Sequence, residues 1–282
     1  SIFKANPDRH IMSVSQNDGN YTNCTCDACK AIDDYEGALS GSIITFLNKL
    51  AARFPDKEFS TLAYLYTMNP PKHVKPLPNV NIMLCDIDCD REVTLTENAS
   101  GKEFVKAMEG WAAITNNIFV WDYGINFDNY LAPFPNFHIL QDNIRLFKKN
   151  HATMHFSQIA GSRGGDFAEL RAYLVSKLMW NPEANVDSLM QHFLHGYYGE
   201  AAPYLYQYIK VMGEYKYSRL SNVYYPMDKN FHELQMRLMV LVLPDSNDKN
   251  QRDTVRKQYL AKIYFLRNAC LDFCLISLLI LK

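Results

Sequence analysis

Residues 117–130 read NIFVWDYGINFDNY, and the change of character within this stretch decides the fold that we expect. Its first four residues, Asn117 to Val120, are typical of a short buried β-strand, because they are rich in β-branched and aromatic side chains. Trp121, Asp122 and Tyr123 then place an acid between two aromatic rings at the end of that strand. Such rings stack on the apolar faces of a sugar while the carboxylate reaches its hydroxyl groups, so the stretch favours a sugar-binding site. The alternative is that Asp122 only caps the loop that follows.

Four more apolar runs predict strands, and helical patterns separate them. The strands are expected at residues 9–15, 59–66, 80–85 and 152–158, and the helices between them at 40–52, 101–114 and 137–149. Strands that alternate with helices are typical of parallel βαβ units. Beyond Asp166 the patterns predict helices only, at residues 166–179, 187–195, 201–212, 229–242 and 250–282.

We therefore expect an α/β part built from parallel (β/α) units, followed near residue 182 by an all-helical part. A (β/α)8 barrel is one arrangement of such units. Five strands do not close a barrel of eight. Either the early strands are absent from this chain, or the sheet is open and doubly wound. The glycine-rich run at residues 161–165 lacks the spacing of a phosphate-binding loop, which disfavours a nucleotide site.

The composition is that of an ordinary globular protein with a sizeable core, since 48% of the 282 residues are hydrophobic and 21% are charged. The net charge of −1 argues against a nucleic-acid partner. The most apolar stretch, residues 270–281, is shorter than a membrane span, so we expect no membrane-spanning segment. An aromatic share of 13% fits either carbohydrate binding or an aromatic-rich core.

The chain has seven cysteines, at positions 24, 26, 29, 85, 89, 270 and 274. An odd number argues against a complete disulfide framework. Cys24, Cys26 and Cys29 could supply three thiolates to zinc, but structural zinc needs four ligands and no fourth is evident nearby. A local disulfide and simple reduced packing are the alternatives. We accordingly assign no metal ligand and expect no cofactor.

Polar and aromatic side chains follow each of the five predicted strands, at the ends that share one face of a βα barrel. We expect Asp18 to be the general acid of a glycoside hydrolysis and Asp122 to be a second, stabilising acid. The substrate-binding residues are expected to be Asn17, Tyr64, Tyr66, Asp86, Trp121, Tyr123 and Asn126. Asp18 precedes Gly19, so the alternative is that it serves only as a turn residue.

Several short motifs resemble a family of uncharacterised-domain proteins that is abundant in gut Bacteroidetes. They are SVSQNDGN, the C-x-C-x-x-C run, FSTLAYLYTMNPP, VWDYGINFDNYLAPFPN, GGDFAELRAYLVSKLMWNP and HGYYG, and together they span about residues 9–208. That family is similar to glycoside hydrolase family 163, whose activity is endo-β-N-acetylglucosaminidase action on complex N-glycans. The resemblance implies a TIM-barrel catalytic domain, a glycan substrate, and export to the periplasm or cell surface. On this basis we expect a fold of TIM-barrel-like (β/α) units, in which residues 1–182 form the C-terminal part of a (β/α)8-type catalytic barrel and residues 183–282 form a helical region packed on it. It also implies a longer protein whose N-terminal region carries the early barrel strands.

The leading interpretation is therefore a glycosidase that acts on N-acetylglucosamine-containing glycans. Its nucleophile would be a second carboxylate or the acetamido group of the substrate itself. Two alternatives stay open: a non-catalytic glycan-binding protein on the same scaffold, and a structural or assembly module.

Overall fold

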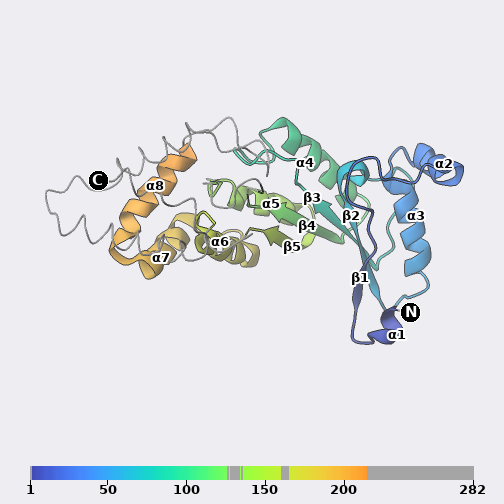
Figure 1. Cartoon of the computed structure of the whole chain (residues 1–282), viewed down its shortest axis with the longest axis horizontal. Coiled ribbons are helices and arrows are strands. Elements are labelled where there is room, and N and C mark those ends of the chain that lie inside the picture. The colour runs from blue at the N-terminus through green and yellow to red at the C-terminus, as the bar shows by residue number, and fades with distance from the viewer. Residues whose placement is uncertain (1, 126, 128–133, 135, 160–164, 215–282) are drawn as a thin grey trace, which may run out of the picture. The chain divides into compact units, whose positions relative to one another are not determined.

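The computed structural model describes residues 2–125, 127, 134, 136–159 and 165–214 of the chain (Figure 1). The chain divides into two compact units, and each is described by itself. The first unit comprises residues 1–90, 94–123 and 142–157, and the second comprises residues 91–93, 124–141 and 158–282. The first unit contains nearly all of the sheet.

The first unit is built on a five-stranded sheet whose strands follow one another in chain order. The strands are β1 (Ile11–Ser13), β2 (Glu58–Ala63), β3 (Val80–Cys85), β4 (Ile118–Tyr123) and β5 (Ala152–Gln158). The first four run parallel to one another. A doubly wound sheet reverses its strand order at a switch point, and these strands show no reversal. The mixed α/β fold and the five strands expected from the sequence are confirmed.

One face of the sheet is closed by helices. Its side chains are at most 1% exposed and come from Phe59, Ala63, Val80, Ile82, Leu84, Ile118 and Val120. The helices that precede β2, β4 and β5 are α3 (Ser40–Ala51), α4 (Ala99–Ala112) and α5 (Leu140–Lys149). They contribute buried Ile44, Phe104 and Phe147 to this core. Because both strands and helices bury their apolar side here, we call this the covered face.

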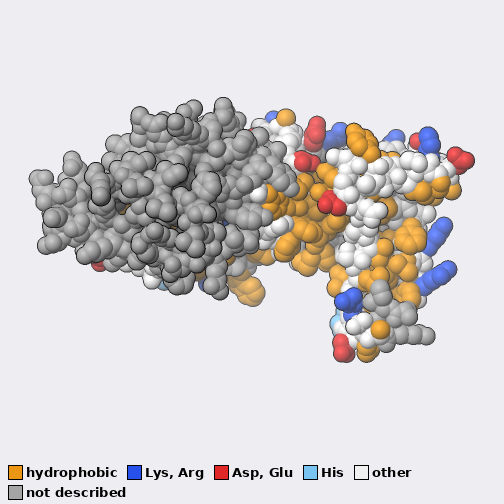
Figure 2. All heavy atoms as spheres, viewed as in Figure 1, with side chains coloured by type: hydrophobic (Ala, Val, Ile, Leu, Met, Phe, Trp, Pro, Cys, Tyr) orange, Lys and Arg blue, Asp and Glu red, His pale blue; other side chains and the backbone are white. Residues whose placement is uncertain are grey.

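The other face of the sheet is partly exposed, and we call it the open face. Parallel partners share a face, so the register pairs Leu62 with Met83 and Cys85 with Trp121 on this side. Hydrophobic side chains gather over the region of β3 and β4 in the space-filling view (Figure 2). On β5, Phe156 is 44% exposed. Parallel sheets are normally covered on both faces, so this exposure is unusual.

A helix that the sequence did not predict, α2 (Asp27–Glu36), follows the cysteine-rich loop. Its buried side chains are two acids, Asp33 and Glu36, rather than a stripe of apolar residues. Asp33 accepts hydrogen bonds from the backbone N–H and hydroxyl of Ser42, at 2.7 and 3.1 Å, and so caps α3. Ala28, Ile32 and Tyr35 of α2 have the spacing of one helix face, but Ala28 and Tyr35 are exposed and Ile32 is half-buried, so this face does not form a core. A shorter helix, α1 (Ile2–Ala5), was likewise not predicted.

The described part of the second unit is mainly helical. It contains α6 (Ala168–Trp180), α7 (Val186–Tyr198) and α8 (Ala202–Glu214), which confirms three predicted helices with small shifts at their ends. The helices predicted at residues 229–242 and 250–282 lie outside the described residues. The division of the chain at residue 182 stays a prediction.

A buried arginine organises part of this second unit. Arg171 of α6 is 1% exposed, and its guanidinium donates hydrogen bonds to the Phe134 carbonyl at 2.7 Å and to the Asn136 side chain. Its guanidinium carbon lies 4.4 Å from the centre of the Phe137 ring. These contacts satisfy the charge away from water. Within the residues that the structure describes, no helix has the length and hydropathy needed to cross a membrane.

Candidate functional site

The loops after β1 and β2 meet through Asp18 and Tyr64. The Tyr64 hydroxyl donates a hydrogen bond of 3.2 Å to Oδ1 of Asp18, a residue 46 positions earlier in the chain. The same oxygen accepts a bond of 2.9 Å from the backbone N–H of Gly19. Asp18 therefore has a contact within its own turn as well as one that reaches the neighbouring strand. Two of the residues that the sequence placed in one site are brought together here.

A second set of contacts fixes the backbone of Tyr64. The Gln16 side-chain amide donates to the Tyr64 carbonyl at 2.8 Å, and the Thr67 hydroxyl donates to the Gln16 side-chain oxygen. The Thr67 hydroxyl oxygen also accepts from the Tyr64 N–H at 3.1 Å. Leu65, which follows, adopts a φ of 50°, a conformation that costs energy for a residue other than glycine. Gln16 and Thr67 thus hold a sharp turn that the sequence analysis did not identify.

The Tyr64 hydroxyl keeps its proton over the physiological pH range. Partial burial raises the pKa of Tyr64 to about 12, with further contributions from the nearby Asp18, Cys85 and Asp88. A negative charge next to a phenol disfavours the phenolate, and a hydrogen bond to a carboxylate favours the protonated phenol. Tyr64 is therefore a hydrogen-bond donor at this position.

Aromatic rings lie on the open face at the ends of β4 and β5. The Trp121 and Tyr123 rings stack with centroids 6.1 Å apart and an angle of 20° between their planes. Phe156 of β5 packs edge-on against Trp121, at 4.9 Å and 89°. Phe156 was not predicted, although the alternation within β5 places every second side chain on this face. Trp121, Tyr123 and Phe156 are called the aromatic row below.

Asp122 points to the covered face, away from its two aromatic neighbours. Its side chain is 10% exposed, and its Oδ1 accepts a bond of 2.8 Å from the Tyr123 backbone N–H. Its Oδ2 lies 3.5 Å from Nε2 of His155, whose ring packs against Phe147 of α5 with centroids 5.4 Å apart. Adjacent strand residues point in opposite directions, which explains the separation. The sequence analysis did not single out His155.

The remaining predicted site residues are distributed as follows. Asp86 comes directly after β3 and is 1% exposed, whereas Asn17 is exposed in the loop after β1. Tyr66 is half-buried in a short 3-10 turn at Leu65–Thr67. Asn126 lies outside the described residues.

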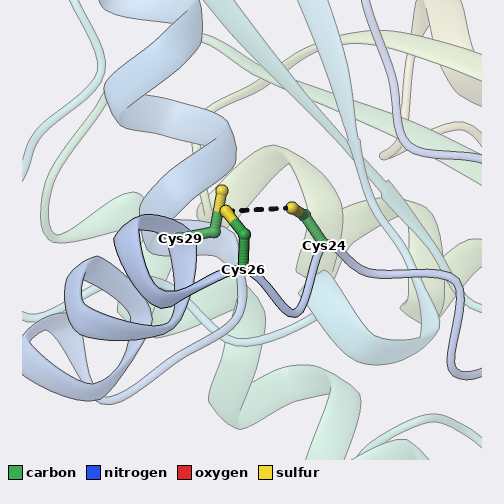
Figure 3. Close-up of side chains that lie close together, drawn as sticks. All are labelled: Cys24, Cys26 and Cys29. Atoms are coloured by element: carbon green, nitrogen blue, oxygen red, sulfur yellow. Dashed lines mark hydrogen bonds between the residues drawn. The ribbon is translucent and has the colours of Figure 1, made fainter.

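Three cysteines form a separate cluster. Cys24, Cys26 and Cys29 are free thiols whose sulfur atoms all lie within 4.8 Å of one another (Figure 3). Backbone N–H groups and the neighbouring thiols lower the pKa of Cys26, whereas the neighbouring thiols raise the pKa of Cys29 to about 12. Cys85 and Cys89 are buried thiols elsewhere in the first unit. Cys270 and Cys274 lie outside the described residues.

Comparison with known proteins gives a family but no characterised relative. Neither the curated proteins nor the solved structures contain a match to this chain. The profile of a family described as Domain of unknown function (DUF4838) matches residues 1–210. This match spans the whole sheet, the Asp18–Tyr64 contact, the aromatic row and the cysteine cluster. The chain therefore belongs to the DUF4838 family.

Proposed function

We propose that this protein is a glycoside hydrolase acting on N-acetylglucosamine-containing glycans, with Asp18 as its acid/base residue. The observation that supports this proposal is the hydrogen bond between Tyr64 and Asp18 at the carboxyl ends of two adjacent parallel strands. Catalytic groups of βα barrels lie at these ends. Trp121 and Phe156 on the open face of the sheet suit the apolar side of a sugar ring, and Tyr123, which is 5% exposed, lies behind Trp121.

The contacts of Asp18 suggest how its two oxygens divide their roles. Both Tyr64 and the Gly19 N–H donate to Oδ1. The other oxygen, Oδ2, would then be the one that exchanges a proton with the glycosidic oxygen. Because Tyr64 remains a donor up to high pH, it would hold the carboxyl group in one orientation through the reaction.

The position of Asp122 favours a particular form of this mechanism. Asp122 lies on the covered face beside His155, so it is better placed to fix the end of β4 than to touch a sugar on the open face. With Asp122 turned away from the open face, the acetamido group of the substrate would act as the nucleophile, as in substrate-assisted glycosidases. We assign Asp122 a positioning role for Trp121 and Tyr123, its neighbours on β4.

The resemblance to glycoside hydrolase family 163 supplies the finer parts of the proposal. It suggests a complex N-glycan as the substrate, a (β/α)8 barrel as the scaffold, and a periplasmic or cell-surface location. The partly exposed face of the sheet fits this scaffold, because it would line the interior of a barrel completed by further strands of the same protein. Tyr66 and Asn17 would complete the sugar site from the loops after β2 and β1.

A glycan-binding protein without turnover is the second candidate. The burial of both Asp86 and Asp122 favours it, because Asp18 is then the exposed member of the three acids proposed from the sequence. Incubation of the full chain with a glycoprotein that carries complex N-glycans separates the two candidates. Released glycan, detected by mass spectrometry, supports the hydrolase. Retention of the glycoprotein without release supports the binding protein, and the absence of both release and retention contradicts both candidates.

A further inference from the structure

The cysteine cluster unites a loop with the start of a helix. Cys24 lies in the loop before α2, Cys26 is the N-cap residue of α2, and Cys29 lies in its first turn (Figure 3). The Cys24 and Cys26 sulfur atoms are 3.4 Å apart, and all three lie within 4.8 Å of one another. Cys24 and Cys26 are exposed and Cys29 is half-buried, so an ion from solvent can reach them.

The separations match those of a metal site. Zinc–thiolate bonds of about 2.3 Å in a tetrahedron put neighbouring sulfur atoms roughly 3.8 Å apart. The cluster needs only small side-chain rotations to reach such distances from its present range. Among the residues that the structure describes, no other group of three histidine, cysteine or acidic side chains is gathered in this way.

The helix that carries two of the thiols is held firmly in place. Asp33 of α2 caps α3 through Ser42, at 2.7 Å to its backbone N–H. Glu36, at the end of α2, accepts bonds of 2.7 and 3.0 Å from the backbone N–H groups of His73 and Val74. Because α2 cannot shift without breaking these buried contacts, Cys26 and Cys29 are fixed before any ion binds.

A disulfide would engage only two of the three sulfur atoms. It joins two sulfur atoms at about 2.05 Å and would leave the third thiol beside the bond, where it could attack it. An ion uses all three sulfur atoms at once. In Figure 3 the Cys24 side chain comes from the loop and points toward Cys26 and Cys29, so the three sulfur atoms face one another.

We propose that Cys24, Cys26 and Cys29 bind one thiophilic divalent metal ion of the zinc class, with solvent as the fourth ligand. Each thiol loses its proton as a metal–sulfur bond forms, so binding releases protons to solvent. The ion would tie the loop that carries Asn17 and Asp18 to the fixed start of α2. The evidence for this metal site does not rest on the proposed glycosidase activity, since it comes from a different set of residues.

The test is a titration of the reduced full chain with cobalt(II) under anaerobic conditions. We expect one cobalt ion per chain, an intense thiolate-to-cobalt charge-transfer band and the visible bands of tetrahedral cobalt, all of them lost on addition of zinc. Each of Cys24→Ser, Cys26→Ser and Cys29→Ser should weaken binding by more than about 100-fold, since even outer partners of a metal site are worth 10–100-fold. The double variant Cys270→Ser/Cys274→Ser is the matched control and should bind as the natural chain does.

Two results would overturn the proposal. One is the absence of the charge-transfer band in the reduced chain. The other is a band that survives all three cluster substitutions or disappears in the Cys270→Ser/Cys274→Ser control. Circular dichroism of each variant shows whether it is folded, so a loss of binding through unfolding is recognised directly.

Discussion

The hydroxyl of Tyr64 donates a hydrogen bond to the carboxylate of Asp18 across 3.2 Å, and this contact joins the carboxyl ends of two adjacent parallel strands. It is held on one side by the turn at Leu65 and on the other by the Asp18–Gly19 turn. The effect of this hydrogen bond on stability and the role of Asp18 in glycan release can be tested separately.

Replacing Tyr64 with Phe should alter the pH dependence of stability. The pKa of Tyr64 is raised to about 12 in the folded chain, above the ordinary phenol value of 10.0. A raised pKa contributes stability that is complete below pH 10 and is lost as the pH rises through about 12. Because Tyr64 is half-exposed, solvent screening reduces the contribution to about 1 kcal/mol.

Urea unfolding of the natural chain and of Tyr64→Phe at about pH 8 and about pH 11 measures this difference. The advantage of the natural chain should shrink at the higher pH. An advantage that grows with pH would show that folding lowers the pKa of the Tyr64 phenol instead of raising it.

Replacing Trp121 with Ala should weaken glycan binding. Stacking of an aromatic ring contributes about 1 kcal/mol beyond its buried area, so we expect a loss of affinity of about tenfold or more for N,N′-diacetylchitobiose by isothermal calorimetry. The matched control is Trp180→Ala at the end of α6, where the ring is 92% exposed. An equal loss of glycan affinity in both variants would show that the aromatic row does not bind the glycan.

Replacing Asp122 with Ala should destabilise the fold by about 2 kcal/mol in urea unfolding, because the Tyr123 N–H would lose its acceptor and a cavity would open beside the buried His155. Asp56→Ala is the control, since Asp56 is exposed in the loop before β2 and should change stability little. An Asp122→Ala variant as stable as the control would argue against a positioning role.

Replacing Gly101 or Gly196 with alanine should change the stability of the fold in opposite directions. A Cβ atom at Gly101 of α4 would lie 2.3 Å from the Leu95 carbonyl oxygen, so Gly101→Ala should cost about 3 kcal/mol. At Gly196 of α7 a Cβ atom would meet nothing within 4 Å, so Gly196→Ala should stabilise by up to about 1 kcal/mol. Thermal unfolding of both variants checks the pair, and a stabilised Gly101→Ala would contradict the packing of α4.

The sheet could be predicted because its strands are apolar runs separated by turn residues, and the structure places them where those runs lie. Helix α2 was missed because it packs through Asp33 and Glu36, whereas its helically spaced apolar residues Ala28, Ile32 and Tyr35 stay exposed or half-buried. Acids are expected at the surface, and only the partners supplied by residues 42, 73 and 74 make their burial favourable.

The candidate site could be predicted only in part from the sequence. Strand ends identified Asp18, Tyr64, Trp121 and Tyr123, but the partners of these residues come from distant segments. Gln16 and Thr67 contact Tyr64 only because two loops meet, and His155 reaches Asp122 only because β5 lies beside β4. The alternation of strand side chains could have shown that Asp122 and Trp121 face opposite sides.

The most direct test of the account is glycan release by Asp18→Asn, measured by mass spectrometry on a glycoprotein with complex N-glycans, beside the control Asp56→Asn. Loss of the acid/base group should slow release by about 100-fold or more, while the fold and Trp121-dependent binding stay unchanged. Asp56 lies before β2, at the opposite ends of the strands, so the Asp56→Asn control should release glycan at the rate of the natural chain. Undiminished release by Asp18→Asn would contradict the role of Asp18 as the acid/base residue.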